Sequence, residues 1–215
     1  MSDVLRELLA ALSDEDFERL YGPLARLEPP EAAEVLAGIE VPWWIVGGWA
    51  IEAFTGVSRT HEDVDVCILA KDLPAAVEVL LDSQHVWAVG SGAMSPMLSP
   101  EQPFPPWAGQ LWTRREATEP WLLDINVAPD HNGRWMFKRD ETVVLDLEDT
   151  IWLGDDGIRY QRPEIVLVFK ALNARSKDDV DLENTLPLLD EPARAWLAAT
   201  VAGLYPNHRW LRQFQ

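Results

Sequence analysis

The chain has 215 residues, of which 47% are hydrophobic and 25% charged, as is typical of a soluble globular protein with one well-filled domain. Lys and Arg number 18 and Asp and Glu 36, which gives a net charge of −18. Such a chain repels phosphate backbones and anionic lipid surfaces, so nucleic-acid-binding and membrane-bound proteins are disfavoured. A cationic partner would be attracted, although an acidic surface also serves solubility alone.

The cysteine content and the apolar runs indicate a compartment. The single cysteine, Cys67, excludes a disulfide framework and a zinc site built from several cysteines. The first residues show no basic stretch followed by an apolar run, so no secretory signal is expected. No apolar run approaches the roughly 20 residues that span a bilayer. We therefore expect a cytoplasmic protein.

Helical periodicity dominates the first forty residues. Leucines recur at helical spacing over residues 5–12, and Ser13 is a suitable N-cap for a second helix that ends near residue 24. After a Pro-Pro break, residues 31–36 predict a short third helix. The expected organisation therefore begins with a helical lead-in over residues 1–40.

A mixed α/β core is expected over residues 41–162, with a sheet flanked by helices. Apolar runs and period-two alternation predict its strands, and amphipathic spacing predicts its helices. Five prolines within residues 91–106 predict a long loop. The predicted elements are a strand over 41–46, a helix over 49–54, a strand over 63–69, a helix over 73–81, and strands over 85–89, 110–114, 121–127 and 142–145.

The last segment, residues 163–215, is expected to form a helical bundle. Pro163 opens a helix to residue 174, and further helices are predicted over 178–189 and 192–204. This segment carries six basic and seven acidic residues, so the acidic excess belongs to the first 162 residues.

Two polar features lie close together in the core. Gly47 and Gly48 stand at a predicted strand-to-helix turn, where glycines let backbone N–H groups approach a phosphate beside a helix N-terminus. Asp63 and Asp65 follow on the next strand, where a spacing of two places both carboxylates on one face. Each feature alone is common, since glycines end many strands and acidic pairs occur in many loops.

A third carboxylate makes this pattern more specific for a metal site. Asp124 stands alone in the apolar run WLLDINV over residues 121–127, and it would meet Asp63 and Asp65 if the two strands were neighbours. Carboxylates so close repel one another unless a cation lies between them. Oxygen ligands of this kind favour Mg²⁺. The alternative for each aspartate is a solvated strand end.

These residues resemble a known family. Residues 44–51, WIVGGWAI, and 59–65, RTHEDVD, are similar to the signature of polymerase-β-type nucleotidyltransferases. The similarity is strongest to the aminoglycoside 2''-adenylyltransferase and lincosamide nucleotidyltransferase branch. It covers roughly residues 41–127 and continues more weakly through 163–189. In much of the superfamily a phosphate-contacting serine follows the second glycine, whereas Trp49 here provides no hydroxyl.

The resemblance implies a reaction in which a substrate hydroxyl attacks the α-phosphorus of an NTP, expected to be ATP, and releases pyrophosphate. Two Mg²⁺ ions would be held by Asp63, Asp65 and the phosphates. Asp124 would bind metal on the acceptor side and could act as the general base. These three aspartates are the predicted catalytic and metal-binding residues.

The predicted nucleotide-binding residues come from the start of the core and from the C-terminal segment. Gly47, Gly48 and Trp49 would hold the triphosphate at the helix N-terminus, and Arg59, Lys170 and Lys177 are candidate phosphate contacts. Arg59 could equally be a solvated loop residue, and Lys170 a lysine whose stem covers apolar surface. Asp178 and Asp181 are expected to form helix caps and ion pairs.

The acceptor suggested by the resemblance is a small hydroxyl-bearing molecule of the aminoglycoside antibiotic type, whose positive charge suits an acidic protein. An alternative is a toxin-like nucleotidyltransferase that modifies a protein or a tRNA end, against which the acidic composition counts for RNA. A second alternative is a nucleotide-binding module without catalysis, which the presence of all three aspartates disfavours. No oligomeric state is predicted.

Overall fold

The computed structural model describes residues 13–214, which form two compact units. Among the described residues, the first unit contains residues 13–44 and 61–146, and the second contains residues 45–60 and 147–214. Each unit thus combines segments that are distant in the sequence. The helix predicted over residues 5–12 lies outside the described residues, and the three-part division at residues 40 and 162 stays a prediction.

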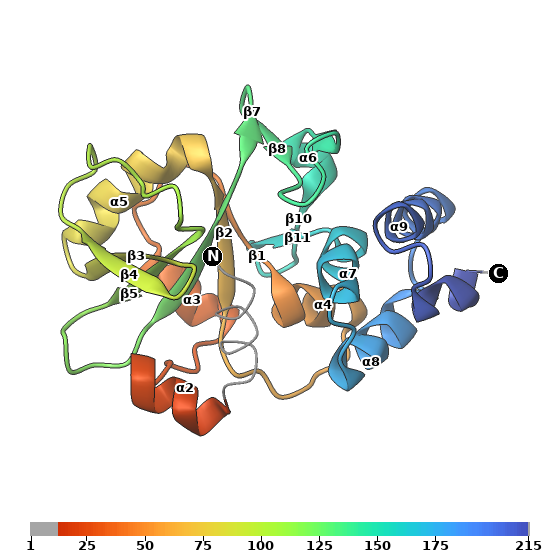
Figure 1. Ribbon diagram of the computed structural model, residues 1–215, viewed down its shortest axis with the longest axis horizontal. Helices are drawn as coiled ribbons and strands as arrows, with labels where there is room; N and C mark the ends of the chain where they lie inside the picture. Colours follow the sequence, from red (N-terminus) through yellow and green to blue (C-terminus); the bar gives the residue numbers. More distant parts are fainter. Residues whose placement is uncertain (1–12, 215) are drawn as a thin grey trace. The chain divides into compact units, whose positions relative to one another are not determined.

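The first unit is built on a five-stranded part of the main sheet, in the order β2-β6-β5-β3-β4 (Figure 1). The β2–β6 pair is parallel, and the other pairs are antiparallel. A separate three-stranded sheet has the order β7-β8-β9. The elements are α2 (Asp14–Tyr21), α3 (Pro29–Val35), β2 (Asp65–Leu69), η1 (Ala70–Asp72), α5 (Leu73–Leu81), β3 (His85–Gly90), β4 (Ala93–Met97), β5 (Gln110–Arg114), β6 (Leu123–Ala128), β7 (Asp130–His131), β8 (Arg134–Met136) and β9 (Val144–Leu145).

The strand register gives the two faces of this sheet different characters. Asp65 lies opposite Asp124, Asp124 opposite Trp112, and Trp112 opposite Trp87. Because directly opposed side chains share a face, carboxylates and tryptophans form one continuous row. The other face is mainly apolar, and its buried apolar residues include Val66, Ile68, Ile125, Leu111, Val86 and Ala88.

An aromatic cluster covers the tryptophan end of that row. Val89, Trp112 and Trp121 form its buried centre, against which Phe17 and Tyr21 of α2 pack. The indole N–H of Trp121 donates to the backbone oxygen of Tyr21 at 2.6 Å. The predicted N-cap of α2 is confirmed, since the Ser13 hydroxyl accepts a hydrogen bond from the Asp16 backbone N–H at 3.1 Å. The predicted helical lead-in therefore covers part of the sheet.

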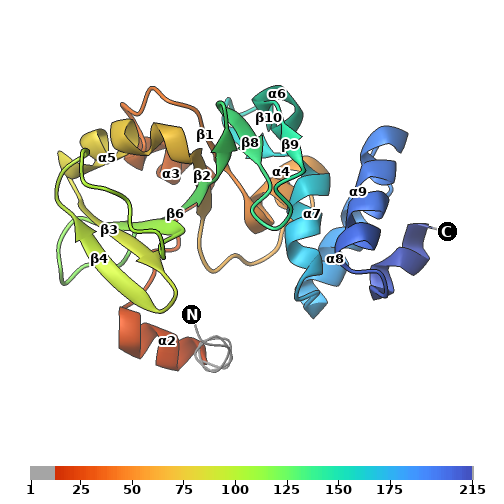
Figure 2. The ribbon, with the colours of Figure 1, turned by 45° about the horizontal axis from the view of Figure 1, so that its top comes forward.

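The second unit is mainly helical. Its strand β11 (Arg159–Gln161) pairs in parallel with β1 (Trp43–Ile45) at Ile45 and antiparallel with β10 (Ile151–Leu153). The helices are α4 (Gly47–Thr55), α6 (Leu147–Thr150), α7 (Pro163–Ala171), α8 (Ser176–Thr185), α9 (Glu191–Leu204) and η2 (Arg209–Phe214). Helix α7 is buried on nearly all sides because α4, α8 and α9 pack around it (Figure 2).

The predicted α/β class is confirmed, with a mixed sheet, flanking helices and a C-terminal helical region. The expected loop over residues 91–106 is wrong in part, because it contains β4. Pro96 is tolerated there because β4 is an edge strand, where a missing N–H breaks no inner ladder. Strands β7, β8, β10 and β11 were not predicted. None of the helices among residues 13–214 is long and apolar enough to cross a membrane.

Gly90 provides a test of the first unit. A Cβ at this position would lie 2.6 Å from the Trp107 backbone oxygen and 2.8 Å from the Ala108 Cα, so backbone atoms would have to move. We expect Gly90→Ala to lower the free energy of unfolding by about 1–3 kcal/mol in urea denaturation. Gly109→Ala is the control, because a Cβ there would meet nothing within 4 Å. Equal stability of the two variants would contradict this packing.

Candidate active site

Two carboxylates lie opposite each other on one face of the first unit's sheet, and the charge of a third acts on one of them. The parallel pairing of β2 and β6 places Asp65 directly opposite Asp124, at the first and second residues of their strands. Asp63 precedes β2 by two residues, and its negative charge acts on Asp124. The structure thus brings together the three aspartates that the sequence singled out, while their catalytic and metal-binding roles stay predictions.

The environment of Asp124 leaves its negative charge poorly compensated. Its Oδ2 accepts a hydrogen bond from Gln110 Nε2 at 2.7 Å, whereas its Oδ1 is buried without a hydrogen-bond partner. Burial raises the pKa of this carboxyl well above its usual value, and the charges of Asp65 and Asp63 raise it further. The nearby Trp112 indole lowers the pKa without making a hydrogen bond of normal geometry, and the Lys138 charge also lowers it.

These features fit a divalent cation. An orphaned, buried carboxylate oxygen and two further carboxylates on the same face supply the oxygen ligands that Mg²⁺ prefers. Among residues 13–214, however, no three His, Cys, Asp or Glu side chains are already gathered as a ligand cluster. Such a site would be completed by substrate oxygens, as is usual for Mg²⁺ held by one or two carboxylates and a phosphate.

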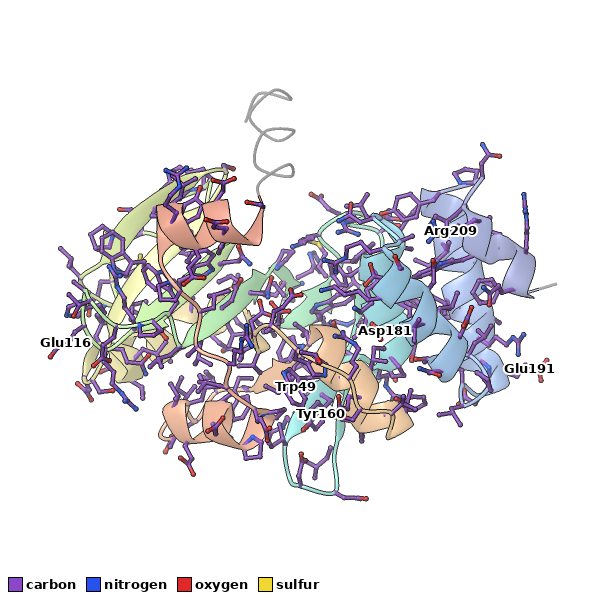
Figure 3. The ribbon with its side chains drawn as sticks, turned by 90° about the horizontal axis from the view of Figure 1, so that it is seen from below. Trp49, Glu116, Tyr160, Asp181, Glu191 and Arg209 are labelled. Carbon is purple, nitrogen blue, oxygen red and sulfur yellow. The ribbon has the colours of Figure 1, made fainter. Side chains whose placement is uncertain are left out.

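The glycine turn lies in the second unit. Gly47 and Gly48 are the first two residues of α4, and no side chain caps this helix N-terminus. Gly47 has a φ of +66°, a left-handed conformation that glycine adopts without strain. The helix begins two residues earlier than predicted, so Trp49 is its third residue (Figure 3). The backbone N–H groups at this end could receive an anion, and phosphate binding there stays a prediction.

Arg59 and Lys170 belong to a buried ion network in the second unit. Arg59 Nε donates to Asp181 Oδ1 at 3.2 Å. Lys170 Nζ lies 3.1 Å from Asp178 Oδ1 and 2.8 Å from Asp181 Oδ2. The exposed fraction of the side chain is 9% for Lys170, 1% for Asp178 and 3% for Asp181. The predicted ion pairs of the two aspartates are confirmed, and the phosphate roles of Arg59 and Lys170 stay predictions.

Asp178 shows how this network compensates its charges. Burial alone would raise the pKa of this carboxyl, but hydrogen bonds from Arg175 and the charge of Lys170 outweigh it and hold the pKa below its usual value. The Arg175 backbone N–H donates to Asp178 Oδ2 at 2.9 Å, which caps the first turn of α8. Lys177, the remaining phosphate candidate, is half-buried in the same turn.

Two residues near the carboxylates were not identified from the sequence. Gln110 holds Asp124, and Lys138 contributes positive charge. Gln110 and Trp112 stand on a predicted strand, but only the β5–β6 register reveals that they adjoin Asp124. Lys138 follows strand β8, which had no sequence signal.

Comparison with known proteins shows that part of the chain is similar to one protein family. The family model described as aminoglycoside-2''-adenylyltransferase matches residues 31–90, a span that holds the glycine turn, Asp63 and Asp65. This match confirms, over that span, the resemblance predicted from the sequence. No curated protein matches the chain significantly.

Two solved structures of ANT(2'')-Ia are similar to this chain. One is described as the solution structure of an antibiotic-resistance factor with substrate-regulated conformation dynamics; it is 19% identical over 82% of this chain and 90% of its own, with a TM-score of 0.48. The other is a crystal structure of that protein in complex with adenylyl-2''-tobramycin, 20% identical over 81% of this chain and 97% of its own, with a TM-score of 0.48.

Removing Lys170 tests the buried network without any nucleotide present. Lys170→Ala leaves two buried carboxylates short of a cation, so we expect the free energy of unfolding to fall by about 3–5 kcal/mol. Arg212→Ala, at an exposed position of the same unit, should change it by less than about 0.5 kcal/mol. If Lys170→Ala is as stable as the control variant, the network is not what holds α7 and α8.

Asp124 provides a test of a buried carboxyl whose charge is poorly compensated, in contrast to Asp178. Because its pKa is raised in the folded state, the ionised Asp124 carboxyl destabilises the fold. This destabilisation is absent below the unfolded pKa of about 3.9. It appears as the pH rises through the folded-state pKa. In metal-free buffer, Asp124→Asn should therefore raise the Tm at neutral pH, and the difference should vanish on acidification. Added Mg²⁺ should raise the Tm of the wild type more than that of Asp124→Asn.

Asp82→Asn is the matched control for Asp124→Asn, because Asp82 is exposed at the end of α5 in the same unit. Its Tm should follow that of the wild type at every pH and Mg²⁺ concentration. A lower Tm of Asp124→Asn at neutral pH would mean that the ionised carboxyl stabilises the metal-free protein, contrary to this electrostatic account.

Proposed function

We propose that this protein is a metal-dependent nucleotidyltransferase that moves AMP from ATP to a hydroxyl group of a small molecule. The observation that carries the proposal is the register of β2 and β6, which places Asp65 opposite Asp124 with the charge of Asp63 acting on it. The family-model match over residues 31–90 supports the same reaction class. The reaction consumes ATP, in agreement with the cytoplasmic location expected from the sequence.

The three aspartates have different roles in the proposed reaction. Asp63 and Asp65 would hold two Mg²⁺ ions, and Asp124 would share one of them. When bound, the ions neutralise charge on the phosphates and on the attacking and leaving oxygens. Asp124 is suited to accept the proton of the acceptor hydroxyl, because a raised pKa makes a carboxylate a better base near neutral pH.

Gln110 has a supporting part in this arrangement. Its amide donates to Asp124 Oδ2 and so fixes the plane of the carboxyl group. Oδ1 is the oxygen that this hydrogen bond leaves available to a metal ion or to the acceptor proton. Gln110 therefore orients the proposed base without entering the reaction itself.

The proposed acceptor is an aminoglycoside-type antibiotic. The net charge of −18 favours a cationic acceptor over RNA, whose phosphates the chain would repel. The family model that matches residues 31–90 describes 2''-adenylyltransferases of aminoglycosides. A cationic substrate with several hydroxyl groups satisfies both observations.

The aspartates supply the direct test of this reaction. We expect Asp63→Asn, Asp65→Asn and Asp124→Asn each to reduce AMP transfer by about a thousandfold or more, which corresponds to about 4 kcal/mol of transition-state stabilisation. Circular dichroism should show that each variant stays folded. Asp82→Asn, with an exposed carboxylate of the same unit, should keep wild-type turnover. Unchanged turnover in the three site variants would refute the assignment.

The acceptor class is tested separately. ATP labelled at the α-phosphate is incubated with aminoglycosides, with protein extract and with tRNA, and the labelled product is identified by mass spectrometry. Labelled aminoglycoside supports the proposal, and labelled protein or tRNA alone would reassign the substrate. Nucleotide binding without transfer to any acceptor would favour a module that has lost catalysis.

A further inference from the structure

Trp112 of β5 and Asp124 of β6 lie directly opposite each other in an antiparallel ladder. The Val127 backbone N–H donates to the Gly109 oxygen at 3.0 Å, and hydrogen-bonded and non-hydrogen-bonded pairs alternate along the ladder from there. Trp112 and Asp124 therefore form a non-hydrogen-bonded pair, the kind in which opposed side chains approach most closely. The two side chains are direct neighbours on the same face of the sheet.

Each of these two side chains has one buried polar atom that is unpaired. The Trp112 indole nitrogen Nε1 is a donor, and Asp124 Oδ1 an acceptor, that find no hydrogen-bond partner within residues 13–214. An indole has only a donor and an ionised carboxyl only acceptors, so the two atoms are complementary. Leaving both unpaired costs the desolvation free energy of each group, which a hydrogen bond between them would recover.

The packing around Trp112 fixes the direction of its N–H group. The residue is 7% exposed. Its ring makes edge contacts with Trp121 and Tyr21, with centroids 5.5 and 6.0 Å apart, and a tilted contact with Phe17 at 5.8 Å. A ring packed on several sides cannot turn without displacing its neighbours. The Asp124 carboxyl, by contrast, turns about a broad sp³–sp² torsion, so its rotation is what would bring the pair into hydrogen-bonding geometry.

We propose that Trp112 is a positioning residue for Asp124, whose Oδ1 accepts a hydrogen bond from the indole N–H while the Gln110 amide holds Oδ2 at 2.7 Å. The inference rests on the proposed function, in which Asp124 accepts the proton of the acceptor hydroxyl. Two donors, one on each oxygen, restrict rotation of the carboxylate more tightly than Gln110 alone. Because a carboxylate offers about four lone-pair sites, each oxygen keeps one for a metal ion or the acceptor proton.

An isosteric replacement separates this role from that of a tryptophan that only fills space. Benzothienylalanine in place of Trp112, incorporated by stop-codon suppression, keeps the bicyclic ring and puts sulfur where the indole has its N–H. We expect kcat for AMP transfer to an aminoglycoside to fall about tenfold or more, the scale of one hydrogen bond to a charged group. The KM for ATP should stay at its wild-type value, because Asp63 and Asp65 are untouched.

The contact itself is tested without nucleotide, from the indole N–H resonances in heteronuclear NMR spectra of the full chain. The Trp112 resonance is the one that the benzothienylalanine variant lacks. A hydrogen bond to a carboxylate moves an indole proton downfield, so we expect Asp124→Asn to move the Trp112 resonance upfield and to leave that of Trp87 in place. An unchanged Trp112 resonance would show that the bond is not made and would overturn the proposal.

Trp87 is the matched control, because it lies opposite Trp112 on β3, on the side of β5 away from β6. The same replacement at Trp87 should leave kcat at the wild-type value. A wild-type kcat in the Trp112 variant, or equal losses in both variants, would overturn the role of Trp112 alone. Absence of AMP transfer by the wild type would instead refute the proposed function, and the role of Trp112 would fall with it even if the NMR spectra show the bond.

Discussion

The candidate site depends on the parallel pairing of β2 and β6, which holds two carboxylates opposite each other. Asp65 and Asp124 could avoid one another by a shift of one residue, which would turn one of them to the opposite face. The apolar residue that follows each aspartate prevents such a shift, since Val66 or Ile125 would then leave the buried face. The hydrophobic pattern of the two strands therefore enforces the proximity of like charges.

Buried carboxyl groups have opposite pKa shifts in the two units. In the second unit, Asp178 and Asp181 meet Lys170 and Arg59 at hydrogen-bonding distance, and the pKa of Asp178 is lowered. In the first unit, the pKa of Asp124 is raised and its Oδ1 has no partner. Compensated acids are explained by folding alone. In the proposed reaction, a cation that arrives with the substrate would compensate the Asp124 carboxyl.

The sequence predicted the residue types of the site better than their arrangement. Period two predicted that Asp63 and Asp65 share a face, and an apolar run singled out Asp124. That β6 lies next to β2 could not be read from the sequence, because β3, β4 and β5 come between them along the chain. Lys138 was missed for a similar reason, since its position follows from the β7–β8 hairpin rather than from a local pattern.

Elements were predicted well where burial on one side creates a clear period, as in α5. They were missed where strands are short and pair within a small sheet, as in β7 and β8. Lys170 shows a related limit of local patterns. A lysine in an apolar helix suggested either a phosphate contact or a surface lysine, whereas its carboxylate partners come from the next helix, α8.

The central claim is that the three aspartates serve transfer at the α-phosphorus of a nucleotide. The most direct measurement compares ATP labelled at the α-phosphate with ATP labelled at the γ-phosphate, each incubated with Mg²⁺ and an aminoglycoside. We expect the acceptor to gain label from the α-labelled nucleotide and none from the γ-labelled one. Label gained from the γ-phosphate, or from neither nucleotide, would contradict it.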